Sequence, residues 1–112
     1  MAFSEFELFK IEKALKGFVQ QFGAELPLAG YCYSMSGHSI VLIRFRPHLR
    51  DPLQRVEYPI AKLTYVATQK LWKISVQRSS ERFVSYQPHP SARDIESALA
   101  VISADELGYF LS

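Results

Sequence analysis

The sequence is poor in the residues that build covalent, metal or phosphate-binding sites. Its single cysteine, Cys32, excludes an internal disulfide bond and indicates a reducing compartment. Five glycines are scattered singly, so no glycine-rich phosphate-binding loop is present. The three histidines, His38, His48 and His89, stand in no spacing that preorganises metal ligands. We therefore expect no cofactor and no metal site.

Long hydrophobic runs and a strong excess of one charge are also missing. No apolar run approaches the roughly 18 residues needed to span a bilayer, and the first residues lack the basic and apolar regions of an export signal. We therefore expect a cytoplasmic protein with no membrane partner. Thirteen basic and 11 acidic residues leave a net charge of only +2, which permits a polyanionic partner without requiring one.

Hydrophobic and aromatic residues, by contrast, are plentiful. They make up 48% and 13% of the 112 residues, enough for a packed core. This length and composition predict one globular domain over residues 1–112.

The N-terminal region predicts a helix over about residues 5–22. Ser4 and Glu7 form an S-x-x-E capping box, and a stripe of apolar residues follows at helical spacing. Phe6 and Phe9 fall outside this stripe, on a face that also carries lysines. Either the C-terminal segment covers them, or they are ordinary exposed residues, or they meet a partner.

The middle of the chain predicts an antiparallel meander of about five strands, because its apolar-rich runs are separated by turns too short for crossover helices. The predicted strands cover about residues 31–35, 38–46, 56–67, 70–78 and 82–86. Pro59, near the start of the third strand, indicates a sheet edge or a bulge.

The C-terminal part predicts helices. Ser91 and Asp94 form a second capping pair, and Ser103 with Glu106 indicates a short last helix. The fold class is α+β, with an N-terminal helix, the sheet, and the C-terminal helix plus the short terminal helix on one sheet face.

One strand alternates apolar and basic residues. Arg44, Arg46 and, if the strand continues past Pro47, His48 project from one side, with Ile43 and Phe45 opposite. This arrangement predicts a sheet with a core face and a locally cationic face.

Further basic residues extend this candidate binding surface. Arg50 and Arg55 lie on the adjoining loop, and Lys62 is a possible further contact with phosphates. Trp72 or Tyr86, if exposed, would stack on an unpaired base. The opposing interpretation is that the arginines pair with the acidic helices of the same chain. We expect a non-catalytic binding module for nucleic acid or an acidic protein surface, and we assign no catalytic residue.

Two other functional classes stay open. Asp51, Glu57 and Lys62 are the one group that would suit a metal-dependent phosphodiester hydrolase, although a regular strand places Glu57 and Lys62 on opposite sides. The chain is alternatively a purely protein-interacting domain that forms a homodimer through Phe6 and Phe9 or through an open sheet edge.

Finally, the order of landmarks resembles the bacterial family named domain of unknown function 3024. The resemblance rests on a set of residues spread over nearly the whole chain: Arg46, Pro47, Asp51, Pro52, Pro59, Ala61, Lys62, Tyr65, Trp72, Arg78, Tyr86, Pro88, Pro90 and Gly108. Where the family is expected to carry a second tryptophan, this chain has Phe83. The resemblance implies a small, stand-alone bacterial intracellular domain and implies no activity, substrate or cofactor.

Overall fold

Two helices and six strands form the described part of the molecule. The computed structural model describes residues 3–21, 30–51, 53–77 and 82–105. The elements are α1 (Glu5–Gln21), β1 (Gly30–Ser36), β2 (Ser39–Pro47), β3 (Arg55–Val66), β4 (Leu71–Gln77), β5 (Phe83–Ser85), β6 (Ser91–Ala92) and α2 (Ile95–Ala104). Neither helix in these ranges is long and apolar enough to cross a lipid bilayer.

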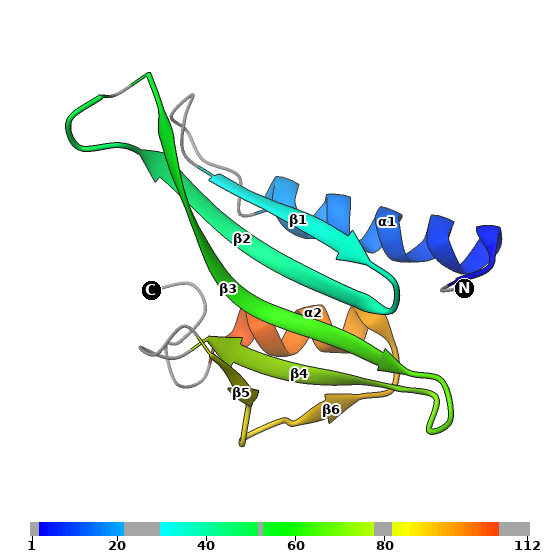
Figure 1. The fold of residues 1–112 in the computed structure, drawn as a ribbon. Helices are drawn as coiled ribbons and strands as arrows, with labels where there is room; N and C mark the ends of the chain where they lie inside the picture. The colour runs from blue at the N-terminus through cyan, green and yellow to red at the C-terminus, as the bar shows by residue number, and fades with distance from the viewer. Residues whose placement is uncertain (1–2, 22–29, 52, 78–81, 106–112) are drawn as a thin grey trace.

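The sheet is an antiparallel meander in the order β1-β2-β3-β4-β5 (Figure 1). This confirms the fold class predicted from the sequence. Gly37 has a positive φ of 58° in the β1–β2 turn, a conformation that glycine adopts without steric cost. The sequence did not predict β6, which pairs with β4 through Trp72 and Ala92. The sheet therefore continues past Pro88 and Pro90, beyond the last predicted strand at about residues 82–86.

Both helices begin with a side chain that accepts a backbone hydrogen bond. In α1 the capping box is reciprocal, since the Glu7 N–H donates to Ser4 Oγ (3.2 Å) and the Ser4 N–H to Glu7 Oε1 (3.1 Å). In α2 the cap is Asp94, whose Oδ1 accepts from the Ser97 N–H at 2.7 Å. The predicted role of Ser91 as a cap is wrong, because Ser91 belongs to β6.

The C-terminal end of α2 is at Ala104. Asp105 follows it in the left-handed conformation, with φ 47°. Ser103 lies inside α2 and does not begin a further helix. The predicted short terminal helix falls on residues 106–112, which lie outside the described residues.

The core lies between the helices and one face of the sheet (Figure 1). Alternate residues of the central strands point into it, such as Ile40 and Leu42 on β2 and Ile74 on β4. The helices contribute residues at helical spacing: Ile11, Leu15 and Phe18 from α1, and Ile95, Ala98, Leu99 and Ile102 from α2.

A bulge divides β3 into two parts. Leu42 pairs with Ala61 but Ile43 pairs with Pro59, so Ile60 is an extra residue on β3. The prediction of an edge or bulge near Pro59 is therefore confirmed. β4 pairs with β3 only from Ala61 onward. Residues 44–51 and 53–58, here called the arm, belong to the end of the β2–β3 hairpin and project beyond β4 (Figure 1).

Candidate functional site

Backbone and side-chain hydrogen bonds hold the loop at the end of the arm. The His48 N–H donates to the Gln54 carbonyl at 2.9 Å, and the Gln54 N–H donates to the Asp51 carbonyl at 3.0 Å. His48 Nδ1 accepts from the Arg50 N–H, and Asp51 Oδ1 accepts from the Leu53 N–H, both at 3.1 Å. The ring of His48 and the carboxylate of Asp51 thus organise the loop.

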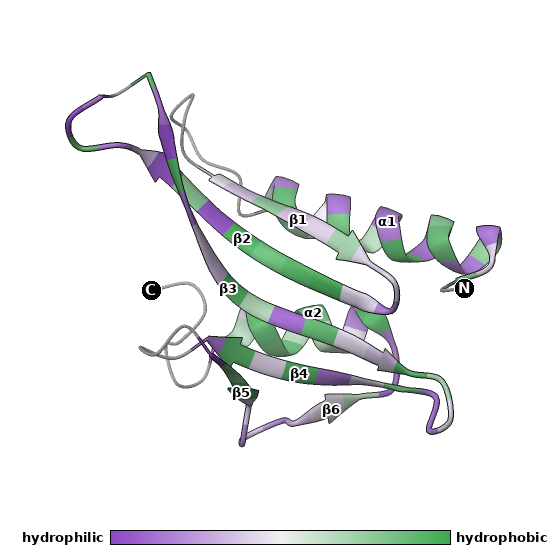
Figure 2. Ribbon diagram, in the orientation of Figure 1, coloured by the Kyte–Doolittle hydropathy of each residue, from purple (hydrophilic) through white to green (hydrophobic). Residues whose placement is uncertain are grey.

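Arg44 and Arg46 lie on the same side of β2, with Ile43 and Phe45 on the other, as alternation predicts. The predicted relation of these sides to the core is wrong, however. Arg44 and Arg46 continue the side of β2 that carries the core residue Leu42. Arg44 is nevertheless partly exposed and Arg46 is exposed, because they lie on the arm. The hydropathy colours of Figure 2 show purple, hydrophilic segments along this part of the hairpin.

An aromatic residue of β3 joins the two arginines. The register pairs Tyr58 with Arg44 and Val56 with Arg46, so all four share one side of the arm. The Arg46 guanidinium carbon lies 4.9 Å from the centre of the Tyr58 ring, within cation–π distance. Tyr58 is 41% exposed, so its ring is still open to a ligand.

The same side of the arm is hollowed. A cavity of about 530 Å³ lies there. Its polar lining comes from Arg46, His48 and Arg50, and its apolar lining includes Val56 and Tyr58. This is the combination that holds an anionic group next to a planar ring.

The other two predicted basic residues face away from this cavity. Arg55 pairs with Glu57 at 2.9 Å and lies over Phe45, 4.4 Å from the ring centre, on the opposite side of the arm. Lys62 lies on that opposite side too, with its amine 5.9 Å from the centre of the Phe83 ring. The six predicted residues therefore form two groups and not one continuous surface.

The hydrolase candidates are only partly brought together. The bulge at Ile60 places Glu57 and Lys62 on the same side of the sheet, contrary to the expectation for a regular strand. Glu57 is nevertheless engaged by Arg55, and Asp51 serves the loop. Within the described ranges, no three histidine, cysteine, aspartate or glutamate residues lie close enough together to hold a metal ion.

The aromatic residues proposed for base stacking are not available. Trp72 is 4% exposed and Tyr86 is 1% exposed, so both belong to the core. Tyr58 is the exposed aromatic residue next to Arg46, and the sequence analysis missed it. The signal was the register of the hairpin, because pairing Pro47 with Arg55 brings Tyr58 opposite Arg44.

Cys32 lies on the side of the sheet away from the helices, where it pairs with Ile43. Partial burial raises the pKa of its thiol, and the charge of Glu57 adds to this shift against the smaller opposite effect of Arg55. A thiol with a raised pKa is a poor nucleophile at neutral pH.

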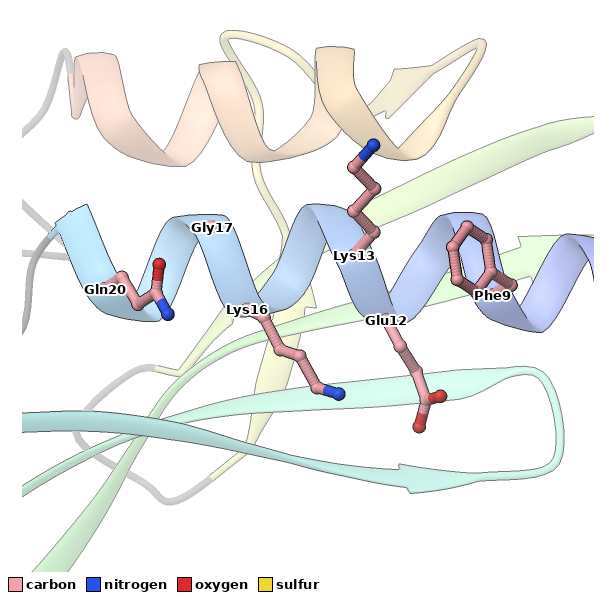
Figure 3. Close-up of a pocket in the computed structure, with 6 residues that line it drawn as sticks. All are labelled: Phe9, Glu12, Lys13, Lys16, Gly17 and Gln20. Atoms are coloured by element: carbon pink, nitrogen blue, oxygen red, sulfur yellow. The ribbon is translucent and has the colours of Figure 1, made fainter.

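A second exposed surface lies on α1. Phe6 and Phe9 are 71% and 65% exposed, and the Lys10 amine lies 5.7 Å from the centre of the Phe6 ring. Beside Phe9, a shallow cavity of about 530 Å³ runs along the helix, lined by Phe9, Glu12, Lys13, Lys16, Gly17 and Gln20 (Figure 3). The homodimer through Phe6 and Phe9 stays a prediction.

Comparison with known proteins places the whole pattern in one family. No curated protein and no solved structure matches the chain. A family model described as "Domain of unknown function (DUF3024)" matches residues 3–112, which include the arm, the sheet and both helices. The chain therefore belongs to the DUF3024 family, as the resemblance in its sequence indicated.

Proposed function

We propose that this protein is a non-catalytic module that binds nucleic acid through the arm. The observation that carries the proposal is the position of Arg46: it is exposed, shares a side with Arg44, and lies against the partly exposed ring of Tyr58. Guanidinium groups bind phosphate oxygens, and an exposed aromatic ring stacks on bases. Both side chains line the same cavity, which supports a single contact area for a phosphate and a base.

The charges around Arg46 favour an external anion. In the part of the chain that the structure describes, no carboxylate forms an ion pair with Arg46 or Arg50. The acidic residue nearest in sequence, Asp51, accepts a hydrogen bond from the loop backbone. A phosphate bound in the cavity would thus meet basic side chains without displacing an internal ion pair.

The shape of the arm fits a groove. A two-stranded β-ribbon enters the major groove of B-DNA, which is about 12 Å wide. An acidic protein surface would also satisfy the arginines, and tyrosine and arginine are common at protein interfaces too. The two-stranded shape of the arm, together with the exposed ring beside Arg46, is our reason for choosing nucleic acid.

The test replaces Arg46→Ala and measures the dissociation constant for duplex and single-stranded DNA across a salt series. We expect affinity to fall about 10-fold for the loss of one charged contact. The slope of log K against log[salt] should become shallower by about 1, as for one lost phosphate contact.

The matched control is Lys16→Ala, which removes the same charge from the exposed side of α1, away from the arm. We expect this variant to bind like the wild type. Equal losses in both variants would show a non-specific charge effect and contradict the arm as the site. Binding to acidic protein but not to nucleic acid would contradict the choice of partner.

A further inference from the structure

The end of the arm carries two leucines that the fold leaves uncovered. Leu49 is 100% exposed and Leu53 is 88% exposed, which makes them the two most exposed large hydrophobic residues described. Exposed leucines are common one at a time. Here two of them stand in the loop that joins β2 and β3 at the end of the arm, and we call this pair, Leu49 and Leu53, the apolar end.

The loop holds these leucines outward. The Leu53 N–H donates to Asp51 Oδ1 at 3.1 Å, and the neighbouring Gln54 is bonded through both its N–H and its carbonyl. Leu49 lies between His48 and Arg50, which the 3.1 Å hydrogen bond between the Arg50 N–H and His48 Nδ1 joins. The backbone of residues 48–51 and 53–54 is therefore already hydrogen-bonded without a partner, which lowers the entropic cost of binding.

Basic side chains stand directly beside the apolar end. Leu49 lies next to Arg50 in the sequence, and both line the cavity that contains Arg46. A partner must therefore offer anionic groups and an apolar surface within the width of one hairpin. Duplex nucleic acid does so, because phosphates flank a stack of apolar base faces.

We propose that the apolar end inserts Leu49, Leu53 or both between neighbouring base pairs of duplex DNA and kinks it. This inference rests on the proposed function and adds the duplex and the deformation of its base step. Proteins that kink DNA insert apolar side chains in this way and hold the flanking backbone with basic residues. An anionic membrane is less well suited, because two leucines offer a lipid surface little apolar area.

The test uses short duplexes that carry the fluorescent base 2-aminopurine at one flexible TA step, with the intact protein. Unstacking of this base raises its fluorescence, so we expect an increase of at least about twofold on binding. In the variant Leu49→Ser plus Leu53→Ser, this increase should disappear. Affinity should fall about 10-fold, while the salt slope stays unchanged because the phosphate contacts remain.

The matched control keeps the side chains apolar. Leu49→Met plus Leu53→Met should retain the fluorescence increase. If both the serine and the methionine variants lost the increase, a disturbed loop and not the loss of apolar side chains would be the cause. Salt-dependent binding without any fluorescence change in the wild type would overturn the insertion of the leucines and leave the proposed function standing. Complete absence of binding would overturn both, as would binding to phosphatidylserine vesicles with none to DNA.

Discussion

Four carboxylate side chains of this protein stabilise its fold. Glu7 and Asp94 cap the two helices, Asp51 holds the loop of the arm, and Glu57 pairs with Arg55. Each of these four carboxylates therefore already has a partner inside the fold. Arg46 differs from them, because it contacts the ring of Tyr58 and its proposed partner is an external phosphate.

Asp94 offers a residue-level prediction with a defined pH dependence. Hydrogen bonds from the Ser97 hydroxyl and backbone N–H lower the pKa of Asp94, so the ionised carboxylate stabilises the folded state. This stabilisation is complete above about pH 4 and is lost as the pH falls through the lowered pKa of the folded protein. Asp94→Ala should cost about 1 kcal/mol at neutral pH.

Urea unfolding at pH 7 and at about pH 2 checks this prediction. The difference in unfolding free energy between wild type and Asp94→Ala should shrink at the lower pH. Asp94→Asn is the control, because its amide oxygen still caps the helix without titrating. An unchanged difference at the two pH values would mean that the charge of Asp94 does not act in the cap.

Among the elements, the two helices were the most predictable from sequence. The capping box of α1 and the buried stripes of both helices depend on local spacing, which a sequence displays directly. The start of α2 was misplaced because Ser91 and Asp94 both resemble caps. Only the pairing of β6 with β4 assigns Ser91 to a strand, and a two-residue strand has no signal of its own.

The candidate site was predictable only in part, because the pairing between strands decides much of its geometry. Alternation along β2 correctly placed Arg44 and Arg46 on one side. It did not reveal which side meets the helices. The position of the bulge at Ile60, which decides where Glu57 and Tyr58 point, depends on the pairing of two strands.

Two glycines give a prediction at the scale of the element. A Cβ at Gly17, in the middle of α1, would meet nothing within 4 Å. Gly17→Ala should therefore stabilise the protein by about 0.5–1 kcal/mol through helix propensity. Gly37→Ala should instead destabilise it by about 1 kcal/mol, because Gly37 has a φ of 58°.

Thermal unfolding of the two variants measures these opposite shifts. If Gly17→Ala lowers the midpoint of thermal unfolding, the added methyl group must clash with something other than the described residues, which leave the space beside Gly17 open. A second chain packed on α1 would be the first explanation to examine, since Gly17 and Phe9 line the same cavity.

At the scale of the whole molecule, both helices lie on one side of the sheet. Leu42 points toward them and is 1% exposed, whereas its neighbour Val41 is half-buried on the other side. Leu42→Ala should cost about 2–5 kcal/mol, since it leaves a cavity in the core. Val41→Ala should cost about 1 kcal/mol.

Urea unfolding of these adjacent variants provides a direct comparison of the two sides. Because Val41 and Leu42 lie on the same strand, a change in strand propensity affects both in a similar way. Equal losses of unfolding free energy would mean that the second side of the sheet is as tightly packed as the first.

The extra residue of β3 has a consequence for how this fold can vary. Ile60 interrupts the alternation of side chains along β3. The side on which residues 55–59 lie is therefore not fixed by Ala61 and Leu63, which must point into the core. If the same sequence paired without a bulge, Ile60 would stand opposite Ile43, and Arg55 and Glu57 would turn to the side where Val56 and Tyr58 now point. Removing Ile60 would instead leave Pro59 opposite Ile43 and Ala61 opposite Leu42, so the arm would keep its present orientation. One extra residue thus separates the alternation of the arm from the alternation of the strand over the core.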